Sequence, residues 1–203
     1  MFLKSQGMTL VEVIMACFVV ATLMGMIALL LNRTIFVNRY AIEQGLNTYS
    51  IDSSLKNFAR FLREARQSDR GDYLLLSAQP FEIVFFSNID NDSAIERVRL
   101  FLSNQQLKMG VAESFGFPAT YPENDQEVKI IGNGIVNTEE QPLFYYYNRD
   151  YPADQINNPL QGVISPQTVS LIKIDVYANI QPGHTPENMR MQTFVRPRNI
   201  DYN

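Results

Sequence analysis

Apolar side chains dominate the chain from residue 8 to residue 31. Residues 13–31 contain no charged side chain, and with residues 8–11 they form a helix long enough to cross a hydrocarbon core about 30 Å thick. One carboxylate, Glu12, interrupts this stretch. An acidic side chain at the middle of a membrane helix costs roughly 2.5–3.5 kcal/mol, so Glu12 needs a compensating partner. The pattern predicts a membrane helix whose single acid is paired.

A second apolar pattern follows in residues 34–67, which contain no proline and one glycine, Gly45. Apolar residues recur there in steps of four, three, four and three, which is the spacing of one helix face. They are Ile51, Leu55, Phe58, Leu62 and Ala65. Gly45 is a weak point or bend, because glycine inside a helix costs about 1 kcal/mol relative to alanine. We expect one helix of about 60 residues, ending near a capping Gly71.

The rest of the chain alternates short runs of Tyr, Phe, Val, Leu and Ile with Pro, Asn, Asp and Gly, a pattern typical of strands and turns. The expected strands are residues 73–77, 81–87, 97–102, 106–109, 127–131, 143–147, 168–178 and 189–195. Residues 110–124 and 148–166 contain prolines and are expected to be surface loops. The fold class is therefore α+β, with a long N-terminal helix packed on a mainly antiparallel β-sheet head.

Composition narrows the range of functions. The net charge is −4 and the pI about 5.1, so nucleic acid is not an expected partner. The single cysteine, Cys17, lies in the apolar stretch, which excludes an intramolecular disulfide. We expect Cys17 to pack as a small hydrophobic side chain, and an intermolecular disulfide is the alternative.

The segment Gly7-Met8-Thr9-Leu10-Val11-Glu12, followed by the apolar run, resembles the N-terminal signal of type IV pilins and type II secretion pseudopilins. The resemblance implies that a prepilin peptidase cuts after Gly7 and that the new N-terminus on Met8 is methylated. A free amine on Met8 would lie within a helical turn of Glu12, and either this amine or that of a neighbouring copy could neutralise the carboxylate. A conventional secretory signal is disfavoured, because the leader has one positive charge and no A-x-A-like site closes the apolar run.

The resemblance divides the chain into four segments: a leader (1–7), a transmembrane and filament-core helix (8–31), an amphipathic helix half (32–70) and a β-rich head (71–203). It implies an inner-membrane protein with its head outside the cytoplasm, later assembled into a pilus or pseudopilus. The implied partners are the prepilin peptidase, other minor pilin or pseudopilin subunits, the inner-membrane assembly platform, and membrane lipid before assembly.

Two regions of the head narrow the resemblance to a branch of the family. The strand, acidic turn and strand of residues 81–102, and the ending T-F-V-R-P-R-N-I of residues 193–200, are similar to the minor pilin PilW and the J-type pseudopilin. Leu29 stands where many major pilins carry proline, and no C-terminal cysteine pair is present. Both departures favour a minor subunit or pseudopilin over a major pilin, and the function that the resemblance implies for such a subunit is assembly at or near a filament tip.

Three oxygen-bearing residues, Asp90, Asn91 and Asp92, occupy the acidic turn. Clustered oxygens can ligate calcium, and pseudopilins of another branch bind calcium in a loop. The spacing of an EF-hand is absent and no glycine shapes the turn, while Asx residues populate turns for local hydrogen bonding alone. The sequence therefore favours an ordinary turn, and no cofactor is expected.

No residue pattern indicates catalysis. His184, the only histidine, lies between two prolines and is expected to be a solvated loop residue. No phosphate loop, zinc spacing or dinucleotide fingerprint is present, so we do not expect an enzyme.

Two further groups could serve as contact surfaces. Tyr145, Tyr146 and Tyr147 could bind a partner or single-stranded DNA, but alternate side chains of a strand point to opposite faces, so at least one is expected to pack inward. Arg196 and Arg198 could pair with acidic groups of a neighbouring subunit, or lie solvated at the end of the last strand.

Two functions follow. The first is a structural assembly subunit whose helix packs among copies in a filament, with Glu12 setting the axial register. The second is a membrane-anchored β-rich binding module that does not polymerise and for which Glu12 is dispensable. A DNA-uptake subunit is a third idea, disfavoured by the acidic balance.

Overall fold

The computed structural model describes residues 8–179 and 188–200. Gly7 and His184 lie outside these residues. The chain divides into two compact units, Met1–Glu43 and Gln44–Asn203. A single α-helix, α1 (Leu10–Arg63), is 54 residues long and contributes to both units. It continues without interruption through Gly45.

Antiparallel strands make up most of the second unit, and the predicted α+β class is confirmed. The strands are β1 (Leu75–Ala78), β2 (Glu82–Ser87), β3 (Glu96–Ser103), β4 (Gln106–Ala112), β5 (Glu127–Asn133), β6 (Phe144–Tyr147), β7 (Leu171–Ala178) and β8 (Met189–Val195). Each lies where the sequence pattern predicts one. The seventh begins three residues later than expected, because a 3₁₀ turn that opens with Pro166, η1 (Pro166–Thr168), ends at Thr168, where the pattern placed the start of the strand.

The first unit consists of the N-terminal part of α1. Every side chain from residue 8 to residue 39 is exposed, including the whole apolar stretch. The helix has the length and composition required to cross a membrane. An apolar surface of this extent has no covering within its own unit, so it is available to lipid or to other protein chains.

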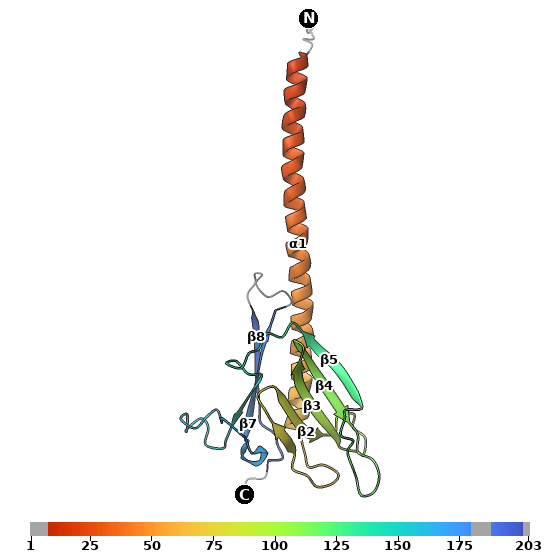
Figure 1. Ribbon diagram of the computed structural model, residues 1–203, viewed down its shortest axis with the longest axis vertical. Helices are drawn as coiled ribbons and strands as arrows, with labels where there is room; N and C mark the ends of the chain where they lie inside the picture. The colour runs from red at the N-terminus through yellow and green to blue at the C-terminus, as the bar shows by residue number, and fades with distance from the viewer. Residues whose placement is uncertain (1–7, 180–187, 201–203) are drawn as a thin grey trace, which may run out of the picture. The chain divides into compact units, whose positions relative to one another are not determined.

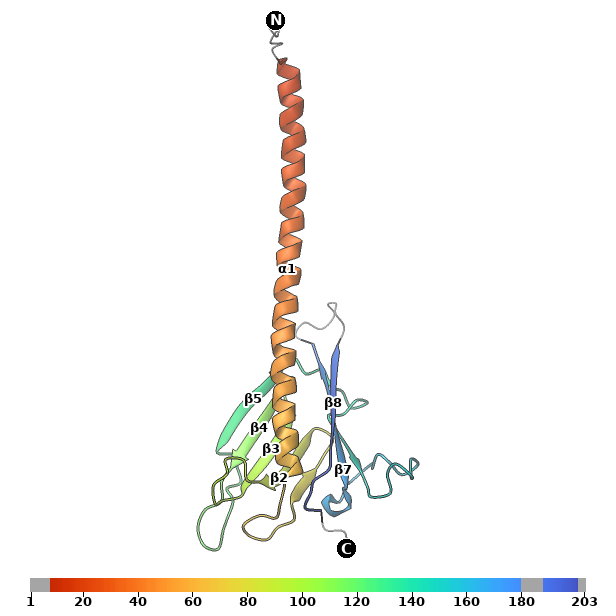
Figure 2. The ribbon, with the colours of Figure 1, turned by 180° about the vertical axis from the view of Figure 1, so that it is seen from behind.

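The second unit is built around the C-terminal part of α1. The predicted stripe is confirmed, because Ile51, Leu55, Phe58, Leu62 and Ala65 are all buried in one core. The strands of a five-stranded sheet, in the order β1-β2-β3-β4-β5, and of a three-stranded sheet, in the order β6-β7-β8, lie on different sides of this helix segment (Figures 1 and 2). Both sheets therefore bury their apolar faces against one helix stripe.

Side chains of each strand point alternately to the two faces of its sheet, and the apolar side chains of the inner faces form the core. On the five-stranded sheet the buried side chains of the inner face include Ile83, Phe85, Val98, Leu100 and Leu107. On the three-stranded sheet they include Ile172, Ile174 and Val176 of β7. The intervening residues form the outer faces, as the period of two requires, and they include the charged side chains Arg97 and Arg99 of β3 and Lys173 and Asp175 of β7.

The helix approaches the five-stranded sheet closely at Gly132 of β5. A side chain at this position would collide with the Ile51 side chain, so only glycine leaves room for the helix. One turn earlier, Asn47 Nδ2 donates to the carbonyl of Asn133 (2.8 Å), and the N–H of Asn133 donates back to Asn47 Oδ1 (3.2 Å). On the other side, Gln44 Nε2 donates to the carbonyl of Ala178 in β7 (3.3 Å).

The end of α1 differs from the prediction. The helix stops at Arg63, and Gly71, which has a φ of +90°, lies in the following turn instead of capping the helix. The helix ends early because of a contact with another part of the fold. The N–H of Arg66 donates to the carbonyl of Phe86 in β2 (3.0 Å), which takes the chain out of the helical path before any glycine is needed.

Candidate functional site

The first turn of α1 holds Glu12 in a capping box. The backbone N–H of Thr9 donates to Glu12 Oε2 (2.8 Å), and the Thr9 hydroxyl donates to the same oxygen (3.0 Å). In return, the N–H of Glu12 donates to Thr9 Oγ1 (3.4 Å). The pair satisfies backbone donors that have no partner inside the helix. A Thr-x-x-Glu spacing before an apolar run is the sequence signal for a capping box. Residues 9–12 have this spacing, so the capping box could have been predicted from the sequence.

This geometry bears on the predicted role of Glu12. The structure brings the carboxylate to Thr9 of its own chain, and Gly7 lies outside the described residues. Glu12 therefore has one function that needs no second chain, the start of the helix. A pairing with the Met8 amine of a neighbouring copy stays a prediction.

The apolar stretch presents large side chains on every side of the helix. Phe18 and Leu29 are each 69 % exposed, and Cys17 is a free, exposed thiol among them. Thr22 and Thr34, which could weaken an apolar helix, donate their hydroxyls to backbone carbonyls one turn earlier. This satisfies their hydroxyl donors within the helix and leaves its surface suited to lipid or to the same segment of other chains.

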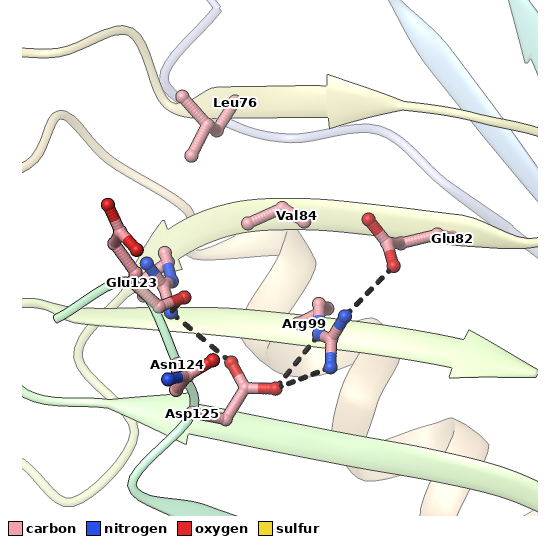
Figure 3. A pocket seen from close by; sticks show the side chains of 8 residues that line it. Leu76, Glu82, Val84, Arg99, Glu123, Asn124 and Asp125 are labelled. Carbon is pink, nitrogen blue, oxygen red and sulfur yellow. Dashed lines mark hydrogen bonds and ion pairs between the residues drawn. The ribbon is translucent and has the colours of Figure 1, made fainter. Parts of the chain in front are cut away.

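A polar pocket of about 260 Å³ lies on the outer face of the five-stranded sheet. Figure 3 shows Arg99 of β3 between two carboxylates, Glu82 of β2 and Asp125. Arg99 binds Asp125 Oδ2 through Nε and Nη2 (2.8 Å each), and its Nη1 reaches Glu82 Oε2 (3.1 Å). Arg97 contacts the other oxygen of Asp125 (3.3 Å) and donates to the carbonyls of Pro122 and Glu123.

The residues that line the pocket hold the loop between β4 and β5 against the sheet, because Arg97 and Arg99 bind residues 122–125 of this loop. The Asp125 side chain lies over Gly110 of β4, where the absence of a Cβ leaves space for it. Asp125 is almost fully buried, and a buried carboxylate held by two guanidinium groups has its charge compensated. The two arginines are balanced by Glu82 and Asp125, so the pocket lacks the unpaired positive charge that an anionic ligand requires.

A second buried carboxylate, Asp175, lies on the outer face of the three-stranded sheet. Lys173 Nζ contacts its Oδ2 (2.6 Å), and Arg190 binds both oxygens through Nε (2.8 Å) and Nη2 (2.6 Å). Burial alone raises the pKa of Asp175, but the hydrogen bonds from Arg190 and Lys173 outweigh it and hold the pKa below its usual value. The negative charge of Asp175 is therefore compensated by Lys173 and Arg190 on the outer face of the same sheet.

The three consecutive tyrosines divide between the faces of β6, as alternation predicts. Tyr146 points inward, is buried, and donates its hydroxyl to the carbonyl of Gln79 (2.8 Å). Burial raises its pKa well above the usual value. Tyr145 receives Lys173 over its ring (4.6 Å), and Tyr147 packs against Tyr151 (4.4 Å between ring centroids). Packing accounts for all three, which disfavours a stacking platform for single-stranded DNA.

The acidic turn between β2 and β3 contains a cluster that differs from the predicted one. The structure groups Asp90 and Asp92 with Glu96, the first residue of β3, and one carboxylate oxygen of each lies within 4.8 Å of the others. Asn91, the third residue of the predicted cluster, lies between the two aspartates in the turn. Its φ is +64°, and its N–H donates to Asn88 Oδ1 (2.6 Å), so it shapes the turn. Sequence reasoning missed Glu96 because it belongs to a strand.

The segment after β8 closes the end of the helix. The N–H of Arg198 donates to the carbonyl of Arg63 (2.9 Å), and Asn199 Nδ2 donates to the carbonyl of Ala65 (2.8 Å). Helix carbonyls at this end have no partner inside the helix. Arg198 and Asn199, which belong to the R-P-R-N sequence near the end of the predicted last strand, therefore have a role inside this chain. Pairing of the Arg196 and Arg198 side chains with a neighbouring subunit stays a prediction.

No family model and no curated protein matches the chain. The structure establishes a pilin-like architecture, which is a long N-terminal apolar helix followed by antiparallel β-sheets.

Proposed function

We propose that the chain is a minor pilin or pseudopilin. In this proposal a prepilin peptidase removes residues 1–7, the new N-terminus on Met8 is methylated, and the protein waits in the inner membrane with its head outside the cytoplasm. It is then assembled at or near the tip of a type IV pilus or a type II secretion pseudopilus, next to other minor subunits. The similarity of the head to PilW and the J-type pseudopilin favours this branch.

One observation carries the proposal: α1 is a single helix whose two parts have opposite surroundings. Its N-terminal part is apolar and exposed over residues 8–31 with Glu12 as the one charge, and its C-terminal part is the buried spine of the head. A subunit that moves from lipid into a helical filament needs this combination, because the first environment is replaced by equivalent helices of neighbouring subunits.

The mechanism is packing and not catalysis. The apolar helix packs among its neighbours in the filament core, while the head offers its loops and sheet faces to other subunits. In the head, Asp125 and Asp175 are bound to cationic side chains, which suits a structural role.

The first test is the intact mass and N-terminal sequence of the protein purified from its own membranes. We expect loss of residues 1–7 and one added methyl group on Met8. A retained leader, or a cut beyond residue 31, would overturn the proposal.

Glu12 allows a sharper test, because charge and capping can be separated. Glu12→Gln keeps the capping box, since glutamine serves at this position, but it removes the charge that would pair with an amine. We expect this variant to remain in the membrane and to enter filaments at least about tenfold less often. The control Thr9→Val disrupts the capping box and leaves the charge, and it should assemble better than Glu12→Gln.

The capping box also supports a second candidate, a membrane-anchored binding module that does not polymerise. In such a module Glu12 serves only to start the helix. This candidate gains support if Glu12→Gln behaves as the wild type while Thr9→Val lowers the amount of inserted protein.

A further inference from the structure

Glu96 contains an oxygen atom that the fold leaves without a partner. Among the described residues, Glu96 Oε1 is the one buried side-chain oxygen or nitrogen that has no hydrogen bond. The residue is 2 % exposed, and its other oxygen, Oε2, accepts from the N–H of Ile89 (2.8 Å). Folded proteins rarely bury a charged oxygen in this way, because its lost hydration is not replaced.

Two more carboxylates converge on the same place. One oxygen each of Asp90, Asp92 and Glu96 lies within 4.8 Å of the others. Asp90 Oδ1 accepts from the N–H of Asp92 (3.2 Å), and Asp92 Oδ1 accepts from the N–H of Ala94 (2.7 Å). These bonds fix the direction of both side chains and use one oxygen of each.

No described lysine or arginine forms an ion pair with this cluster, in contrast to Asp125 and Asp175. Burial, together with the charges of Asp90 and Asp92, raises the pKa of Glu96 despite the hydrogen bond from Ile89. Three carboxylates thus converge, one of them is buried with an unbonded oxygen, and no cationic side chain of the described residues compensates their charge.

We propose that Asp90, Asp92 and Glu96 bind one calcium ion. All ligands are carboxylate oxygens, which hard cations prefer. Oxygens on opposite sides of a calcium ion are about 4.6–5.2 Å apart, so three oxygens within 4.8 Å fit one coordination sphere. Asp90 and Asp92 are exposed, which leaves room for waters to complete the six to eight ligands that calcium takes.

A bound calcium ion would hold the turn between β2 and β3 in place against the rest of the head. Ile95, next to Glu96, donates its N–H to Asp69 Oδ2 (3.0 Å), and Asp69 also accepts from the hydroxyl of Ser114 (2.5 Å). Tyr121 donates its hydroxyl to the carbonyl of Ile95 (2.7 Å). The cluster therefore adjoins the point where the segment after α1, the turn and the β4–β5 loop meet, and calcium would stabilise all three.

The test uses the full chain in detergent micelles after treatment with a chelator. Isothermal titration calorimetry should show one calcium ion per chain, with half-saturation at about 0.1–1 mM. At about a hundred times the dissociation constant, the unfolding temperature measured by circular dichroism should rise by about 5–10 °C. Magnesium should need at least a tenfold higher concentration. Absence of calorimetric binding, or an equal response to magnesium, would overturn the site.

Two variants and one control locate the effect. Glu96→Gln and Asp92→Asn should each lose the calcium-dependent rise, and Asp92→Asn retains the Oδ1 atom that accepts from Ala94. Without calcium, Glu96→Gln should be at least as stable as the wild type, because it removes a buried charge. The control Glu139→Gln removes an exposed charge elsewhere and should keep the full rise. If Asp92→Asn keeps the rise, or the control loses it, calcium acts by general screening and the proposal is wrong.

Discussion

The two parts of α1 are equally helical but differ in what their side chains contact. In the N-terminal part, apolar side chains occupy all sides and all are exposed. In the C-terminal part, Ile51, Leu55, Phe58 and Leu62 form one stripe, which is buried in a core shared with two β-sheets. The apolar side chains of the N-terminal part can be buried only against lipid or other chains. Those of the C-terminal part are buried within the head and stabilise its fold.

The same residue type therefore has different consequences in the two parts of the helix. Phe58 packs edge-on against Phe85 of β2 (5.2 Å between ring centroids), while Phe18 is 69 % exposed. Substitutions in the C-terminal part should therefore act on folding of the head, and substitutions in the N-terminal part on insertion and assembly.

The largest effect is expected for a matched pair of phenylalanines. Phe58→Ala should lower the free energy of unfolding of the head by about 3–5 kcal/mol, because it leaves a cavity between the helix and β2. Phe18→Ala should leave the unfolding of the head unchanged and reduce incorporation into filaments. Denaturant titration of the full chain in detergent, followed by circular dichroism, measures the first effect. Equal losses from both variants would contradict the division of the helix into two parts.

A smaller effect is expected at the contact of the helix with β5. Gly132→Ala should lower the free energy of unfolding by about 1–3 kcal/mol, because its methyl group must displace Ile51 in a packed core. Gly25→Ala is the control in the exposed part, where no atom lies within 4 Å of the added carbon. The same denaturant titration compares them. A Gly132→Ala protein as stable as the wild type would show that the helix and β5 can separate without loss.

The smallest effect is expected at the C-terminal end of α1. Asn199→Ala removes the donor to the carbonyl of Ala65 and should cost about 1 kcal/mol. Arg198→Ala keeps its backbone N–H, which is the donor to Arg63, so it should cost less. Thermal unfolding of both variants checks the order. A greater loss for Arg198→Ala would assign the closure to the arginine side chain.

The sequence predicted the helix, its buried stripe and the eight strands because each depends on local periodicity. Residues 51–65 repeat at the helical spacing, and the strands alternate or are bounded by turn residues. The end of the helix was predicted wrongly, because a backbone bond from Arg66 to β2 ends it, and a bond between segments far apart leaves no local pattern.

The candidate sites also differ in whether they depend on a local sequence pattern or on contacts between distant segments. The capping box of Thr9 and Glu12 is local, and its spacing could have been recognised in the sequence. The acidic cluster is only partly local. Asp90 and Asp92 were visible as a turn, but the pattern of β3 gave no reason to expect a buried, unbonded carboxylate at its first residue, Glu96.

The closure of α1 by residues near the end of the chain also has a kinetic consequence. Asn199 and its partner Ala65 are 134 positions apart, and β7, which covers one side of the buried stripe, lies late in the sequence as well. Contacts of such long range form slowly, because the intervening chain must first be ordered. While the protein is being made, the stripe of residues 51–65 is therefore covered on one side at most. Newly synthesised chains should pass through a stage in which this helix is open to chaperones, until the final residues close it.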